Sequence, residues 1–113
     1  MDKILIKEIL DQPDAIKDLI LNESEHMIEI CENIKEKFDY ILIAARGTSD
    51  NAARYAQYLL GSFNRIQVAL ATPSLYTTYQ TPPSLKGALV LGISQSGQSP
   101  DIVSVLASAK KQG

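Results

Sequence analysis

The chain has 113 residues, of which 45% are hydrophobic and 21% charged, a balance typical of one folded domain and unlike that of a disordered segment. Eleven lysines and arginines against thirteen aspartates and glutamates give a formal net charge of −2, so we expect no nucleic acid or anionic membrane as a partner. One cysteine cannot form an intramolecular disulfide, and no apolar run resembles a signal peptide or a membrane span, so we expect a cytoplasmic protein.

The first third of the chain has the periodicity of helices. Apolar residues recur every three or four positions between Ile6 and Ile34. Pro13 interrupts this pattern, because proline removes a backbone donor and suits the first turn of a new helix, and Asp14 would be favourable near the positive end of that helix. We predict a helix, a break and further helix, and we treat residues 1–37 as an N-terminal helical segment.

Beyond residue 37, short apolar runs alternate with helical patterns. The runs at 40–45, 66–71 and 88–93 read as short strands, and the nearly continuous apolar run at 40–45 is typical of a strand buried on both faces. Helices are predicted from Ser49 to a stop at Gly61 and from Pro100 onward, with a helical turn after Pro73. This order predicts an α/β fold, a three-layer αβα sandwich of the flavodoxin- or Rossmann-like kind, over residues 38–113.

The last predicted helix ends in Lys110-Lys111-Gln112-Gly113, a lysine-rich turn and a glycine of the kind that usually precede another strand. We therefore expect a truncated domain with about three strands. Such a sheet has an edge that further strands would cover, and an open edge favours pairing with another chain. A homodimer is the expected assembly.

Two polar loops follow strands of the predicted sheet. Arg46-Gly47-Thr48-Ser49-Asp50-Asn51 follows the first strand and Ser94-Gln95-Ser96-Gly97-Gln98-Ser99 follows the third. Both offer hydroxyls and a glycine at the start of a helix, where unpaired backbone N–H groups bind anions. Neither loop matches the lysine-containing P-loop pattern, so a monophosphate held by neutral donors fits better than a nucleotide.

Each of these features also has an ordinary structural interpretation. Serine and glutamine are common helix caps and turn residues, and either loop alone is weak evidence for binding. Arg46 could neutralise part of a ligand's charge or pair with a carboxylate such as Asp50. Tyr76 is interpreted as a packing residue with one wet end.

The sequence offers no metal site or nucleophilic triad. His26 is the only histidine, and with Cys31 it makes too small a ligand set for a metal. No serine, histidine and carboxylate can be assembled into a catalytic set. We expect neither a metal nor a cofactor.

Three segments together resemble one known family. KEILDQPDAI, ILIAARGTSDNAARYAQYLL and GALVLGISQSGQSPDIVSVL are similar to the SIS (sugar isomerase) domains of the isomerase half of glucosamine-6-phosphate synthases and of related glucosamine-6-phosphate deaminases. The resemblance implies a phosphosugar ligand, fructose 6-phosphate or glucosamine 6-phosphate. By position, it implies that the sugar 6-phosphate is held by Ser94, Gln95, Ser96 and Ser99 with help from Ser49, and that Gly47 and Thr48 line the sugar.

The resemblance also sets limits on the expected activity. The synthases carry a cysteine before the glycine of this first loop, whereas Arg46 here resembles the deaminase-like branch. The family's general base, ring-opening histidine and Schiff-base lysine lie beyond Gly113, so we expect this chain to bind a phosphosugar without turning it over. The alternative is the phosphosugar-sensing SIS domain of a transcription regulator, although no DNA-binding module is evident.

Overall fold

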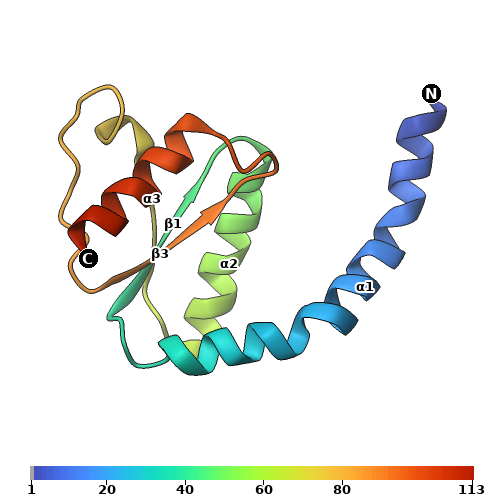
Figure 1. Cartoon of the computed structure of the whole chain (residues 1–113), viewed down its shortest axis with the longest axis horizontal. Helices are drawn as coiled ribbons and strands as arrows, with labels where there is room; N and C mark the ends of the chain where they lie inside the picture. Colours follow the sequence, from blue (N-terminus) through green and yellow to red (C-terminus); the bar gives the residue numbers. More distant parts are fainter. Residues whose placement is uncertain (1) are drawn as a thin grey trace. The chain divides into compact units, whose positions relative to one another are not determined.

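The computed structural model describes residues 2–113, which divide into a first unit ending at Lys35 and a second unit, Glu36–Gly113 (Figure 1). The first unit is the helix α1, Lys3–Ile34. The second contains three strands and three helical segments. In chain order these are β1 (Tyr40–Ala45), α2 (Thr48–Asn64), β2 (Val68–Leu70), η1 (Pro73–Leu75), β3 (Ala88–Ile93) and α3 (Pro100–Gln112).

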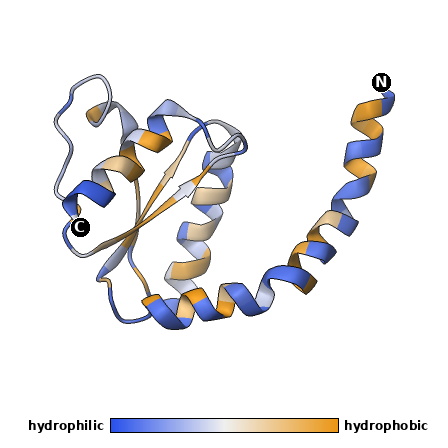
Figure 2. Cartoon of the chain, in the orientation of Figure 1, coloured by the Kyte–Doolittle hydropathy of each residue, from blue (hydrophilic) through white to orange (hydrophobic). Residues whose placement is uncertain are grey.

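Helix α1 is continuous, so the predicted break at Pro13 is wrong. Asp2 caps the helix by accepting a hydrogen bond from the Ile4 amide at 3.0 Å. Pro13 lies inside the helix, where it removes a single backbone hydrogen bond while the residues on both sides keep the helical pattern. None of the described α1 residues is buried, and Figure 2 shows hydrophobic and hydrophilic residues interleaved along its length.

The three strands form one parallel sheet in the order β2-β1-β3. Side chains of the central strand alternate between its two faces. Ile41, Ile43 and Ala45 pack in a core cluster with Ala53 of α2, and Leu42 and Ala44 pack in a second cluster with Ile102 and Val105 of α3. Because each face of the sheet has its own helix, the predicted three-layer αβα architecture is confirmed.

Helix α2 is longer than the sequence indicated, because Gly61 does not end it. Gly61 lies inside the helix, and the left-handed residue that closes it is Arg65, with φ 55°. The amide of Ile66 bonds back to the Leu60 carbonyl at 3.3 Å and completes the turn. A non-glycine residue therefore takes the conformation that usually favours glycine at a helix end.

Close packing of α3 on β3 depends on Gly92. A Cβ atom at this position would lie 2.8 Å from Cδ1 of Leu106 and 3.1 Å from Cγ2 of Ile102. The absence of a side chain lets the first turns of α3 approach the strand. The strand therefore sets where the N-terminus of α3 lies.

Candidate functional site

The two polar loops line one cavity of about 370 Å³ at the carboxyl ends of β1 and β3. Figure 1 shows the loop after β3 beside the start of α2. Six of the seven residues predicted to bind ligand line this cavity: Thr48, Ser49, Ser94, Gln95, Ser96 and Ser99. Arg46 and Ile102 complete the lining. The register of the sheet explains the convergence, because Ala45 pairs with Ile93 and both loops begin at the same level.

Gly47 is the predicted site residue that this cavity does not include. It lines an adjoining cavity of about 450 Å³, which Arg46 also borders. Its φ of 61° and ψ of −132° belong to a region that residues with a Cβ rarely adopt, although the space around it is open. Gly47 is therefore needed for the turn from β1 into α2, whichever groups contact a ligand.

The loop after β3 holds its shape through its own serines. The Gly97 amide donates a hydrogen bond to Oγ of Ser94 at 3.0 Å, and the Gln98 amide donates to Oγ of Ser96 at 3.1 Å. Gly97 has a φ of 69°, in the left-handed region. Since both serine oxygens act as acceptors, their hydroxyl hydrogens stay free to donate to an anion.

The helices that follow the loops add backbone donors. Within the described chain, neither N-cap residue, Gly47 for α2 or Ser99 for α3, makes a side-chain hydrogen bond that caps its helix. The first N–H groups of a helix have no intrahelical partner, and the helix dipole favours negative charge at that end. Two N-termini of this kind beside one cavity favour an anionic ligand.

Arginines neutralise the carboxylates in the first turns of both helices. Nε of Arg54 lies 3.0 Å from Oδ2 of Asp50, one turn away on α2. Nη1 of Arg46 lies 2.8 Å from Oδ2 of Asp101, in the first turn of α3. The sequence had suggested Asp50 as a partner for Arg46, and the structure gives Asp101 instead.

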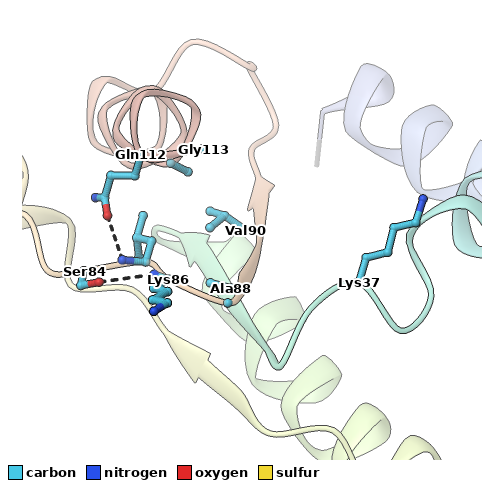
Figure 3. Close-up of a pocket in the computed structure, with 10 residues that line it drawn as sticks. Lys37, Ser84, Lys86, Ala88, Val90, Gln112 and Gly113 are labelled. Atoms are coloured by element: carbon cyan, nitrogen blue, oxygen red, sulfur yellow. Dashed lines mark hydrogen bonds between the residues drawn. The ribbon is translucent and has the colours of Figure 1, made fainter.

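A larger cavity, of about 520 Å³, lies at the opposite ends of the strands and contains none of the predicted residues (Figure 3). Gln112 accepts a hydrogen bond from the Leu85 amide at 2.9 Å and donates one to the Pro83 carbonyl at 3.2 Å. Lys37 and Lys86 border the same space. Because ligands of open α/β sheets bind at the carboxyl ends of the strands, the smaller cavity is the better candidate site.

Other chemistry-bearing residues lie apart from the candidate site. Tyr76 packs against the core on the α3 side of the sheet, and burial, with a smaller contribution from Tyr40, raises the pKa of its hydroxyl. Residues 2–113 contain no group of three or more histidine, cysteine, aspartate or glutamate side chains placed to hold a metal ion. Over the same residues, no helix is long and apolar enough to cross a membrane.

The chain is similar to longer proteins of known sequence. It is 35% identical to a glutamine–fructose-6-phosphate aminotransferase (isomerizing) of Caldanaerobacter subterraneus over 99% of this chain and 19% of that protein. The corresponding protein of Pyrococcus horikoshii is 33% identical over the same shares. The chain thus spans about a fifth of the length of these curated relatives.

A solved structure and a family model agree with these relatives. A "putative phosphosugar isomerase" of Silicibacter pomeroyi superimposes with a TM-score of 0.87 and 30% sequence identity, over 95% of this chain and 33% of the other. The model of the SIS domain matches residues 34–113. That match covers both polar loops and the whole sheet, and the chain belongs to the SIS domain family.

Proposed function

We propose that this chain binds a hexose or hexosamine 6-phosphate, either fructose 6-phosphate or glucosamine 6-phosphate. The observation that carries the proposal is the convergence of five hydroxyl side chains, one amide side chain and two uncapped helix N-termini on the 370 Å³ cavity. A phosphate monoester is a small anion that accepts several hydrogen bonds, and such donors are suited to it. The names of the aminotransferase relatives support a 6-phosphate of fructose as one ligand.

The two cavities suggest how such a ligand would lie. In this proposal the phosphate occupies the cavity between the loops and accepts hydrogen bonds from Ser94, Gln95, Ser96 and Ser99, with Ser49 on the α2 side. The sugar extends past Thr48 toward Gly47, which borders the adjoining 450 Å³ cavity. We infer this direction because Arg46 borders both cavities, which makes them neighbours.

We further infer that this chain is the binding part of a larger enzyme that interconverts hexosamine 6-phosphate and fructose 6-phosphate. Moving a proton between C1 and C2 of the sugar needs a positioned base. The described residues that line the phosphate cavity include no carboxylate or imidazole, and Asp50, the carboxylate that borders the adjoining cavity proposed for the sugar, is paired with Arg54 at 3.0 Å. The chain would therefore supply phosphosugar binding, and other parts of the enzyme would supply proton transfer.

A homodimer in the cytoplasm is the assembly and location that we propose. Both outer strands of the sheet, β2 and β3, have one edge without a strand partner in the described chain. Open edges favour association with a second chain. Light scattering coupled to size-exclusion chromatography would give the solution mass, and a monomer at micromolar concentration would contradict this part of the proposal.

A nuclear magnetic resonance titration tests ligand binding directly. We expect fructose 6-phosphate and glucosamine 6-phosphate to shift the backbone amide signals of residues 46–51 and 94–99. Inorganic phosphate should shift the same loops less strongly, and unphosphorylated fructose should leave them unchanged. Shifts confined to the larger cavity, around Lys86 and Gln112, would place the ligand elsewhere and refute the proposal.

A further inference from the structure

The ion pair between Arg46 and Asp101 links the first loop of the candidate site to the helix that follows the second loop. Arg46 directly follows β1, and Asp101 is the second residue of α3. Their side chains are 57% and 32% exposed, so the pair contributes little to stability. Arg46 is nevertheless the one charged residue among the described residues that line the phosphate cavity. A role in ligand binding explains its placement better than a role in folding.

Asp101 is well placed for the helix and badly placed for an anionic ligand. A carboxylate in the first turn interacts favourably with the positive end of the helix dipole. The same turn begins beside Ser99 and continues through Ile102, both of which line the phosphate cavity. An unpaired carboxylate there would repel a phosphate and would offset the attraction of the helix N-terminus.

The first-turn carboxylates of α2 and α3 are paired with arginines from different parts of the chain. On α2, Asp50 is paired with Arg54, one turn further along the same helix. On α3 the corresponding positions after Asp101 are Ser104 and Val105, neither of which carries a charge, and Val105 is buried. Helix α3 therefore lacks a cation of its own within reach of Asp101. Arg46, from the neighbouring strand, supplies it at 2.8 Å.

We propose that Arg46 is a positioning residue of the phosphate site, which acts by neutralising Asp101 so that the N-terminus of α3 stays attractive to a phosphate. This inference rests on the proposed phosphosugar function. It assigns Arg46 an indirect role, since the hydroxyls and backbone amides hold the ligand. It also explains how Asp101, an acidic residue, can lie in the same turn of α3 as a site for an anion.

A set of four variants tests the inference, with fructose 6-phosphate and inorganic phosphate as probes and calorimetry as the readout. Arg46→Met should weaken the binding of both by about fivefold, because Asp101 is left unpaired. Arg46→Lys should bind like the original chain. The double variant Arg46→Met/Asp101→Asn should recover most of the loss, because the uncompensated charge is gone. Lys110→Met, which removes an equal charge from the last turn of α3, should have no effect.

Salt separates this electrostatic role from a change of shape. At 1 M NaCl exposed charges are strongly screened, so the difference between Arg46→Met and the original chain should nearly vanish. A double variant as weak as Arg46→Met would overturn the inference and indicate that Arg46 contacts the phosphate. Equal affinity of Arg46→Met and the original chain would overturn it and leave the proposed function intact. Failure of the original chain to bind either probe would refute both.

Discussion

Ala45 and Ile93 are the last paired residues of β1 and β3, and they lie directly opposite each other in the parallel sheet. The polar loops begin one residue beyond this pair, so their hydroxyls start from the same level of the sheet and converge on one cavity. The site is thus a consequence of strand register. Any change that shifts the register or tilts either following helix would separate the two halves of the cavity.

Ser96→Ala should lower the affinity for fructose 6-phosphate by about tenfold or more. A hydrogen bond to a charged group contributes about 1.5–3 kcal/mol, and this serine also accepts from the Gln98 amide that shapes the loop. Calorimetry on the whole chain measures the change. Ser104→Ala is the matched control, because its hydroxyl bonds to the Pro100 carbonyl at 2.7 Å and lies outside the cavity. Equal losses from both variants would contradict the assignment.

Gly47→Ala and Gly61→Ala should change stability in opposite directions. At Gly47 the backbone conformation disfavours any Cβ, and the substitution should lower the free energy of unfolding by about 1–3 kcal/mol even though no atom lies within 4 Å. At Gly61, inside α2, alanine should raise it by about 0.5–1 kcal/mol. Urea denaturation followed by circular dichroism measures both. A neutral Gly47→Ala variant would argue against the observed turn.

Much of the fold is predictable from local sequence. The observed bounds of β1 and β3 coincide with the apolar runs at 40–45 and 88–93. Strand β1 is buried on both faces, as its continuous apolar run indicates, whereas β3 is only partly buried at the side of the sheet. The predictions were wrong where one helix-breaking residue lies within a long helical pattern. Pro13 and Gly61 are both conventional helix breakers, yet each lies inside a helix. The cost of one such residue is smaller than the gain from many favourable neighbours.

The sequence predicted the hydrogen-bond donors of the candidate site but not its ion pair. The hydroxyl residues follow from the position of the loops after neighbouring strands, and six of the seven predicted residues line one cavity. The partner of Arg46 was missed because Asp101 is distant in sequence and only the pairing of β1 with β3 brings the two together. The sequence does contain one indication of this pair. No lysine or arginine occurs three or four positions after Asp101 on its own helix, so a cationic partner has to come from another segment.

Tyr76 should make the fold sensitive to strongly alkaline solution. Burial raises the pKa of its hydroxyl in the folded chain, with a smaller contribution from Tyr40, so above pH 10 the unfolded chain releases this proton more readily than the folded one. The partly buried neutral hydroxyl of Tyr76 therefore stabilises the fold below the unfolded pKa, and this stabilisation is lost as the pH rises through the raised pKa of the folded chain. Denaturation at pH 8 and pH 11 should show a smaller loss for Tyr76→Phe than for the original chain. Identical losses would count against this cause.

Gly92→Ala should weaken both the fold and the site, because it acts on the contact that places α3. The added Cβ would meet Leu106 at 2.8 Å and Ile102 at 3.1 Å, and overpacking of this kind costs about 1–3 kcal/mol of unfolding free energy. Since Ile102 also lines the phosphate cavity, affinity for fructose 6-phosphate should fall with stability. Leu106→Ala in the same chain removes the nearer clash, so the double variant should lose less stability than the sum of the single losses. Additive losses would show that α3 does not rest on Gly92 in this way.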